Sequence, residues 1–319
     1  MSLRSLTSRR LLKLIVATIA VLVVALAVDA RLVYDSLARI SPSDIAILAA
    51  LSFLLIGASV WKWGCFLRHL GICAGFWRLF RLYLIGYFVN VFTPSFVGGD
   101  VVRSFYIGSS VDKAHAVSAT FLERYTGVVA MLAMALCAVF LSDVVTFEIQ
   151  LLVVSLAAGC GLATWFIFAG TLGKLANRVR APQRIIGIID RVHEGLAWGV
   201  KDFRLVAKTL AISLMFHVLT VINTAAVAQA IGWSAVPWTG LLIVVPLILI
   251  VGAVPISPQG LGIQEGAFVF FLSSVGATVD QALAIALVLR AKSYVLALCG
   301  GFLWLGIRSP NILASNDRH

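Results

Sequence analysis

Long apolar segments dominate this chain and constrain its fold more than any other feature. A helix needs about 20 apolar residues to cross a bilayer. Only 12% of the residues are charged, whereas a soluble domain carries about 25%. We therefore predict an all-α polytopic membrane protein whose residues 1–319 form a single integral membrane domain. The predicted full spans are 11–28, 45–66, 118–141, 150–172, 206–231 and 282–306.

The charges that flank these segments predict an orientation. Basic and acidic flanks alternate along the chain, from four Lys/Arg in residues 1–13 to eight in residues 173–208. Cytoplasmic loops collect Lys and Arg. We therefore expect a protein of the cell inner membrane with both termini in the cytoplasm. Because the basic residues sit in these short flanks, the net charge of +11 does not indicate a nucleic-acid partner.

Two segments each allow two interpretations. Basic residues precede the apolar run of 11–28, as in a signal peptide. We favour an uncleaved first helix, because further apolar segments follow. Apolar residues recur at spacings of three and four in 183–204, with basic residues between them. This pattern predicts an amphipathic helix on the inner leaflet, or alternatively a loop helix packed on the bundle.

Two further apolar regions, 82–112 and 240–276, are interrupted. The predicted orientation places both flanks of the first region inside the cell and both flanks of the second outside. We therefore expect two oppositely oriented re-entrant broken-helix hairpins, as in inverted-repeat transporters. The alternative is that proline and glycine kink two ordinary spans. The interrupting residues are Pro94, Gly98 and Gly99 in the first region, and Pro255, Pro258, Gly260 and Gly262 in the second.

Charged side chains within apolar helices are expensive and usually functional. Asp100 is spaced to pair with Arg103, and both Asp100 and Glu265 are placed to cap a helix. Adjacent helical residues do not face each other, so Glu123 and Arg124 each need a partner elsewhere. Arginine binds phosphate through its planar fork, so the arginines could contact a lipid phosphate. The alternative is that they only form static ion pairs with the carboxylates. The candidates are Asp100, Arg103, Glu123, Arg124, Glu265 and Arg290, with Lys292 as a weaker seventh.

Other polar residues in the apolar helices have structural explanations. Interhelical hydrogen bonds account for Asn90, His217 and Asn223. The five cysteines fit no zinc or redox spacing, so we expect neither a disulfide nor a metal. The sequence contains no nucleophile elbow and no Walker A loop. We therefore expect no catalytic residues and no cofactor, and transport would be passive or ion-coupled.

Three segments in combination resemble the lysylphosphatidylglycerol synthase transmembrane family, also called the flippase-like membrane family. They are Asn90 through Arg103, Glu123–Arg124 with Gly127, and Pro255 through Tyr294. The resemblance extends over about residues 45–306. It implies re-entrant hairpins and transfer of a lipid between leaflets. Family members are linked to aminoacylated phosphatidylglycerol and to polyprenyl-phosphate-linked sugars. Bifunctional members carry a soluble aminoacyltransferase domain. We do not expect that domain here, and we therefore expect no synthase activity.

The main hypothesis is a flippase for an anionic phospholipid or a polyprenyl-phosphate-linked lipid. Arginines would receive the headgroup and carboxylates would neutralise them when it leaves. One alternative is a membrane-embedded lipid-modifying enzyme with Glu123 or Glu265 as base. Another is an accessory subunit for a lipid-biosynthetic enzyme or membrane glycosyltransferase. The residues assigned to substrate are Asp100, Arg103, Glu123, Arg124, Glu265, Arg290 and Tyr294, the last adding a hydroxyl one turn from Arg290.

The re-entrant topology makes a prediction about accessibility. A cysteine substituted at Ser109 should react with a membrane-impermeant thiol reagent only from the cytoplasmic side, because both flanks of 82–112 are expected there. Labelling in intact cells and in inverted vesicles measures this. Labelling from outside the cell would overturn the re-entrant topology.

Overall fold

The computed structural model describes residues 40–93, 97–108, 113–168, 202–254 and 259–306, and every regular element within these ranges is an α-helix. Five of these helices are long and apolar enough to cross a membrane: α3, α6, α7, α10 and α13. The all-α fold and five of the predicted spans are thereby confirmed. The predicted span 11–28 and nearly all of segment 183–204 lie outside the described residues. The helices are α3 (Pro42–His69), α4 (Phe76–Asn90), α5 (Val97–Ile107), α6 (Lys113–Val139), α7 (Phe147–Phe168), α10 (Phe203–Ala230), α11 (Trp238–Gly252), α12 (Ile263–Ser273) and α13 (Val279–Gly306).

Side-chain caps set the start of several long helices. Ser41 and Asp44 form a reciprocal capping box at the start of α3, with Pro42 in the first turn. The carboxylate of Asp202 accepts hydrogen bonds from two backbone N–H groups of α10. Thr278 and Gln281 cap α13 in the same reciprocal way. These caps satisfy N–H groups that have no partner within the helix.

Both interrupted regions consist of two short helices. α4 and α11 have 15 residues each, and α5 and α12 have 11 each. At the helical rise these are about 22 and 16 Å long, too short to cross a hydrocarbon core of about 30 Å. Each pair packs together as a hairpin, α4 on α5 and α11 on α12. The side of the membrane from which each hairpin enters stays a prediction.

The structure corrects the position of the first break. Gly98 and Gly99 were predicted to interrupt the helix, but they lie within α5, which begins at Val97, and α4 ends before them at Asn90. Gly99 instead lets the two helices of the hairpin touch. A Cβ atom at Gly99 would lie 2.3 Å from the carbonyl oxygen of Gly86, and its N–H donates to Asn90 Oδ1 at 2.7 Å. This close packing, rather than a turn, is what requires glycine at this position.

The second break has the backbone geometry expected of a glycine-rich interruption. Gln259, Gly260 and Gly262 have φ angles of 49°, 67° and 79°, in the left-handed region. A Cβ atom at Gly260 would also lie 2.8 Å from the carbonyl oxygen of Gly252, so this hairpin repeats the close contact of the first. Glu265 Oε2 accepts from the N–H of Gly262 at 2.7 Å, which confirms its predicted capping role.

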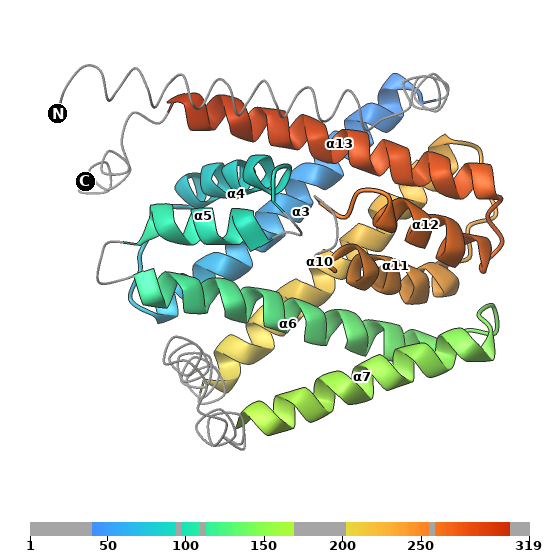
Figure 1. Cartoon of the computed structure of the whole chain (residues 1–319), viewed down its shortest axis with the longest axis horizontal. Helices are drawn as coiled ribbons and strands as arrows, with labels where there is room; N and C mark the ends of the chain where they lie inside the picture. The colour runs from blue at the N-terminus through green and yellow to red at the C-terminus, as the bar shows by residue number, and fades with distance from the viewer. Residues whose placement is uncertain (1–39, 94–96, 109–112, 169–201, 255–258, 307–319) are drawn as a thin grey trace.

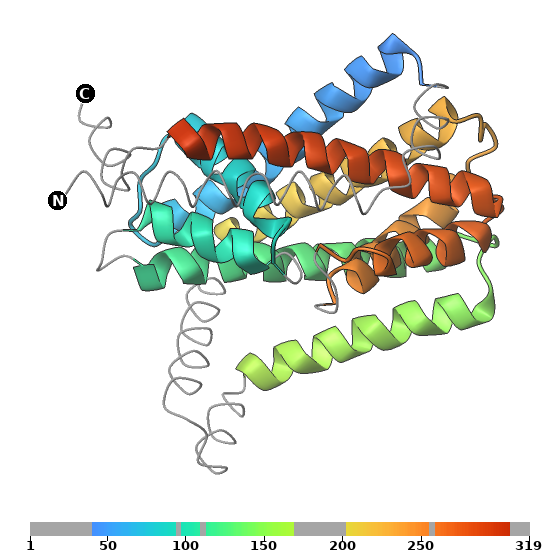
Figure 2. The ribbon, with the colours of Figure 1, turned by 45° about the horizontal axis from the view of Figure 1, so that its top comes forward.

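The two hairpins lie toward opposite ends of the long helices (Figure 1). One apolar cluster surrounds α4 with α3 and α6, and a second joins α11 and α12 with α6, α10 and α13. α4 packs along α13, and α3 along α10. α7 packs on α6 and stands away from the other helices in Figure 2. The breaks also touch each other, since the N–H of Gln259 donates to the carbonyl of Thr93 at 3.4 Å.

We predict that Gly99→Ala lowers the free energy of unfolding by about 1–3 kcal/mol, because the added methyl meets backbone that cannot move aside without separating α4 from α5. Thermal unfolding in detergent measures the effect. Gly159→Ala in α7 is the control, since a Cβ atom there has no neighbour within 4 Å. Equal melting temperatures for the two variants would contradict the packing role of Gly99.

Candidate functional site

Two cavities lie in the bundle and adjoin each other. The first has a volume of about 280 Å³ and is lined by α3, α4, α5, α6, α10 and α11. The second has a volume of about 210 Å³ and lies between α10, α11, α12 and α13, with contributions from α3 and α4. Both cavities are lined by Tyr87, Phe216, Thr220 and Leu249, which therefore form their common wall.

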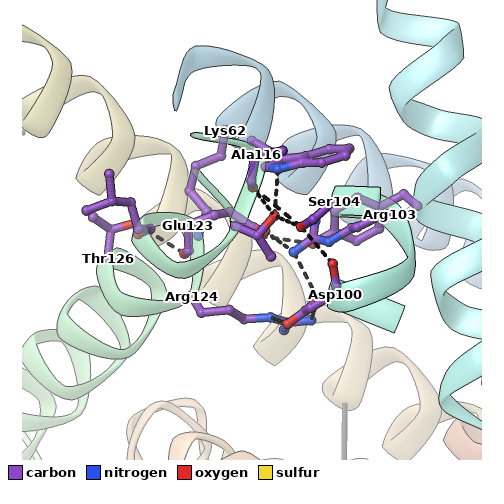
Figure 3. Close-up of polar contacts among 12 residues, drawn as sticks. Lys62, Asp100, Arg103, Ser104, Ala116, Glu123, Arg124 and Thr126 are labelled. Carbon is purple, nitrogen blue, oxygen red and sulfur yellow. Dashed lines mark hydrogen bonds and ion pairs between the residues drawn. The ribbon is translucent and has the colours of Figure 1, made fainter. Parts of the chain in front are cut away.

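Four predicted site residues form one ion-pair network in the first cavity. Arg103 pairs with Asp100 at 3.0 Å and with the carboxylate of Glu123. The guanidinium of Arg124 reaches across to both oxygens of Asp100, at 2.8 and 2.9 Å (Figure 3). The predicted pairing of Asp100 with Arg103 is confirmed. So is the prediction that Glu123 and Arg124 find their partners elsewhere, here on α5.

Aromatic rings hold Arg103 in place. Its guanidinium lies 4.7 Å from the ring centroid of Trp63 and 4.4 Å from that of Tyr83, and the residue is only 1% exposed. The Tyr83 hydroxyl donates to Glu123 Oε1 at 2.9 Å, so both oxygens of this carboxylate are engaged. A cation between two rings gains cation–π attraction as well as its ion pairs. Arg103 thus ties α3, α4, α5 and α6 together.

Arg124 differs from Arg103 in exposure. Its side chain is 47% exposed, against 2% for that of Arg103. Val128 and Ala253, which also line the first cavity, are exposed as well. The first cavity is therefore open at the surface between α6 and α11.

The second cavity contains the other predicted pair. Arg290 pairs with Glu265 and lies 3.4 Å from the carbonyl oxygens of Gln259 and Gly260. Its guanidinium is 6.0 Å from the ring centroid of Tyr294. The arginine on α13 thereby binds the break before α12 as well as its first turn. The geometry matches the static pair considered from the sequence and also leaves Arg290 lining a cavity.

The structure thus divides the six predicted charged residues into two groups, one for each cavity, whereas Tyr294 lines neither. Tyr294 lies near Arg290 and packs in a small apolar cluster with Phe88 and Val91. Gly260 and Gly262 lie in the second break, as predicted. The three predicted break prolines, Pro94, Pro255 and Pro258, lie outside the described residues.

Two lysines line these cavities, and sequence analysis missed one and undervalued the other. Lys62 is 5% exposed, and its Nζ donates to Ser213 Oγ at 3.0 Å. Lys292 is partly buried and donates to Asn223 Oδ1 at 2.6 Å. Lys62 had a recognisable signal, because it interrupts the apolar segment 45–66.

The polar residues assigned to interhelical hydrogen bonds make them. Asn90 joins α4 to α5 and Asn223 joins α10 to α13. The Nε2 atom of His217 lies 2.9 Å from the carbonyl oxygen of Gly127, which joins α10 to α6. Within the described part of the chain, no cluster of three or more His, Cys, Asp or Glu side chains is placed to hold a metal ion.

The buried network predicts a non-additive effect on stability. Arg103→Met should destabilise the protein by about 3–5 kcal/mol, because it leaves Glu123 buried without its counter-charge. The double variant Arg103→Met/Glu123→Gln should recover part of that loss. Thermal unfolding in detergent measures both, with the exposed Asp143→Asn as control. Additive losses in the double variant would contradict direct coupling of this pair.

Comparison with known proteins agrees with this architecture. The chain is 22% identical over 308 residues to a UPF0104 membrane protein of Methanothermobacter thermautotrophicus, covering 88% of this chain and 90% of that protein. A second UPF0104 membrane protein of the same organism is 24% identical over 290 residues, covering 80% of each chain. Residues 10–301 match the family described as the lysylphosphatidylglycerol synthase TM region. The chain is therefore a multi-pass membrane protein that belongs to the lysylphosphatidylglycerol synthase transmembrane family.

Proposed function

We propose that this protein is a flippase that moves a lipid with an anionic headgroup between the leaflets of the cell inner membrane. The observation that carries the proposal is the pair of adjoining cavities, both lined by buried or partly buried charges within an apolar bundle. Buried charges in membrane helices commonly mark a substrate pathway. Two hairpins that meet at their breaks suit transport by inverted repeats.

The opening of the first cavity supports a lipid rather than a soluble solute. Arg124 and Val128 of α6 and Ala253, which directly follows α11, lie at that opening. A headgroup would enter there while its acyl or prenyl tails remain in the bilayer, where they incur no cost of transfer into water. The headgroup would then meet the ion pairs of the first cavity before those of the second. Arginine forks suit a phosphate group in both places.

A lipid-modifying enzyme is less well supported. Glu123 accepts from Tyr83 and Arg103, and Glu265 accepts from Gly262 and Arg290. Every carboxylate oxygen of the two candidate bases is therefore already engaged. Each of these carboxylates is also paired with an arginine, which stabilises its charged form and so makes it a weaker base. We accordingly propose no enzymatic activity for this chain, and treat a lipid-biosynthetic or glycosyltransferase partner as an outcome to be tested.

Reconstitution into liposomes tests the flippase. Wild type should exchange fluorescent phosphatidylglycerol or a polyprenyl-phosphate sugar between leaflets, measured by chemical quenching of the outer leaflet. Arg290→Ala and Glu265→Gln should each slow exchange by about tenfold or more, the loss expected when one charged hydrogen bond is removed.

Arg204→Ala is the matched control, because this arginine is exposed at the start of α10 and lines neither cavity. All variants should elute as folded, monodisperse protein. Wild type that exchanges neither lipid while folded would refute the flippase. A chemically altered lipid in mass spectra would then point to an enzyme, and a co-purifying glycosyltransferase would point to an accessory subunit.

A further inference from the structure

The two cavities have the same excess of positive charge. Three cationic side chains line the first, Lys62, Arg103 and Arg124, against the two carboxylates of Asp100 and Glu123. The second cavity is lined by two cationic side chains, Arg290 and Lys292, and by one carboxylate, Glu265. With His217 neutral, each cavity therefore carries one uncompensated positive charge from the described residues.

The lysines are the source of this excess. The three arginines are each ion-paired with a carboxylate. Neither Lys62 nor Lys292 has a carboxylate within 4 Å among the described residues, and each donates instead to a neutral oxygen on α10. Glu123 attracts Lys62 electrostatically, but from more than 4 Å away. A cation left without a counter-ion in an apolar bundle is costly unless a ligand supplies the opposite charge.

A line of polar groups on α10 connects the two lysines. Ser213, His217, Thr220 and Thr224 follow one another at spacings of four, three and four, which places them on one face of the helix. Ser213 holds Lys62 at one end of this face, whereas Asn223, which holds Lys292, lies three residues after Thr220 and to the side of the face. Thr220 lies between them in the common wall of the cavities. Ser213 and Asn223 are ten residues apart, about 15 Å along the helix axis.

We propose that Lys62 and Lys292 are two successive binding sites for a single phosphodiester group of one net negative charge, which passes between them along the polar face of α10. This deepens and rests on the proposed flippase function. The charges of the arginines are already balanced by their carboxylate partners, so the lysines supply the net attraction for the headgroup. A headgroup with one net negative charge neutralises each cavity in turn, and a zwitterionic headgroup does not.

The test uses full-length protein in phosphatidylcholine liposomes, with acyl-labelled phosphatidylglycerol or acyl-labelled phosphatidylcholine as probe. Wild type should exchange the anionic probe at least about tenfold faster than the zwitterionic one, the ratio expected for one charge-assisted contact. Lys62→Met and Lys292→Met should each abolish this preference, and Lys62→Arg and Lys292→Arg should retain part of it. Lys208→Met is the control, since Lys208 is exposed on α10 and lines neither cavity.

Thermal unfolding of the same variants separates binding from structure. Because the methionine variants lose an uncompensated buried charge, their melting temperatures should equal or exceed that of wild type. Phosphatidylglycerol should raise the melting temperature of wild type, and raise it less in the methionine variants. Methionine variants that unfold at lower temperature and show no change in lipid preference would overturn the proposal and make the lysines structural.

The remaining outcomes distinguish this proposal from the function on which it rests. Exchange by wild type with no charge preference, unchanged in the methionine variants, would overturn the lysine sites and leave the flippase intact. Stabilisation by phosphatidylglycerol that depends on both lysines, without exchange, would support the sites and refute the flippase. Lysine-dependent uptake of radiolabelled inorganic phosphate, without lipid exchange, would overturn the lipid as ligand.

Discussion

A buried guanidinium in an apolar bundle is the constraint on which one half of this structure depends. Arg103 is almost completely buried, and it is stabilised only because Asp100 of its own helix, together with Glu123 and two aromatic rings from neighbouring helices, surrounds it. Removing a charge from water is expensive, and the surrounding groups must offset that expense together. The position of α5 against α6 follows from this requirement. So does the shape of the first cavity, because the same side chains line it.

In the second half of the structure, the buried polar groups that need partners belong to the backbone of the second break. A break in a membrane helix exposes carbonyl groups that water does not reach. Arg290 lies near two of these carbonyls, and Glu265 accepts an N–H from the start of the next helix. The ion pair between them therefore joins α13 to the break and to α12. Close glycine contacts in both hairpins bring the short helices near enough for these bonds to form.

The prediction from sequence succeeded where hydrophobicity decides the outcome. Five predicted spans became helices, and both interrupted regions became pairs of short helices, because apolar length and Pro/Gly interruptions are local properties of the chain. It was wrong about Gly98 and Gly99, which lie inside α5. Glycine serves both in turns and at close helix crossings, and the sequence does not distinguish the two uses. Lys62 was missed because a single lysine near aromatic residues resembles the flank of a span.

The sequence by itself determined that this protein is a helical membrane protein and which of its segments are interrupted. It also determined which charged residues lie within apolar helices, where burying a charge is costly. These properties follow from the transfer of each residue between water and lipid, so no knowledge of neighbours is needed. Only the tertiary structure decided that Arg124 pairs with Asp100 rather than with Glu123 and that the predicted charges form two groups. It also decided that, among the described residues, the lysine in each group has no carboxylate partner. Such pairings join helices that are far apart in the sequence, and they depend on which charged side chains the packing of those helices brings together.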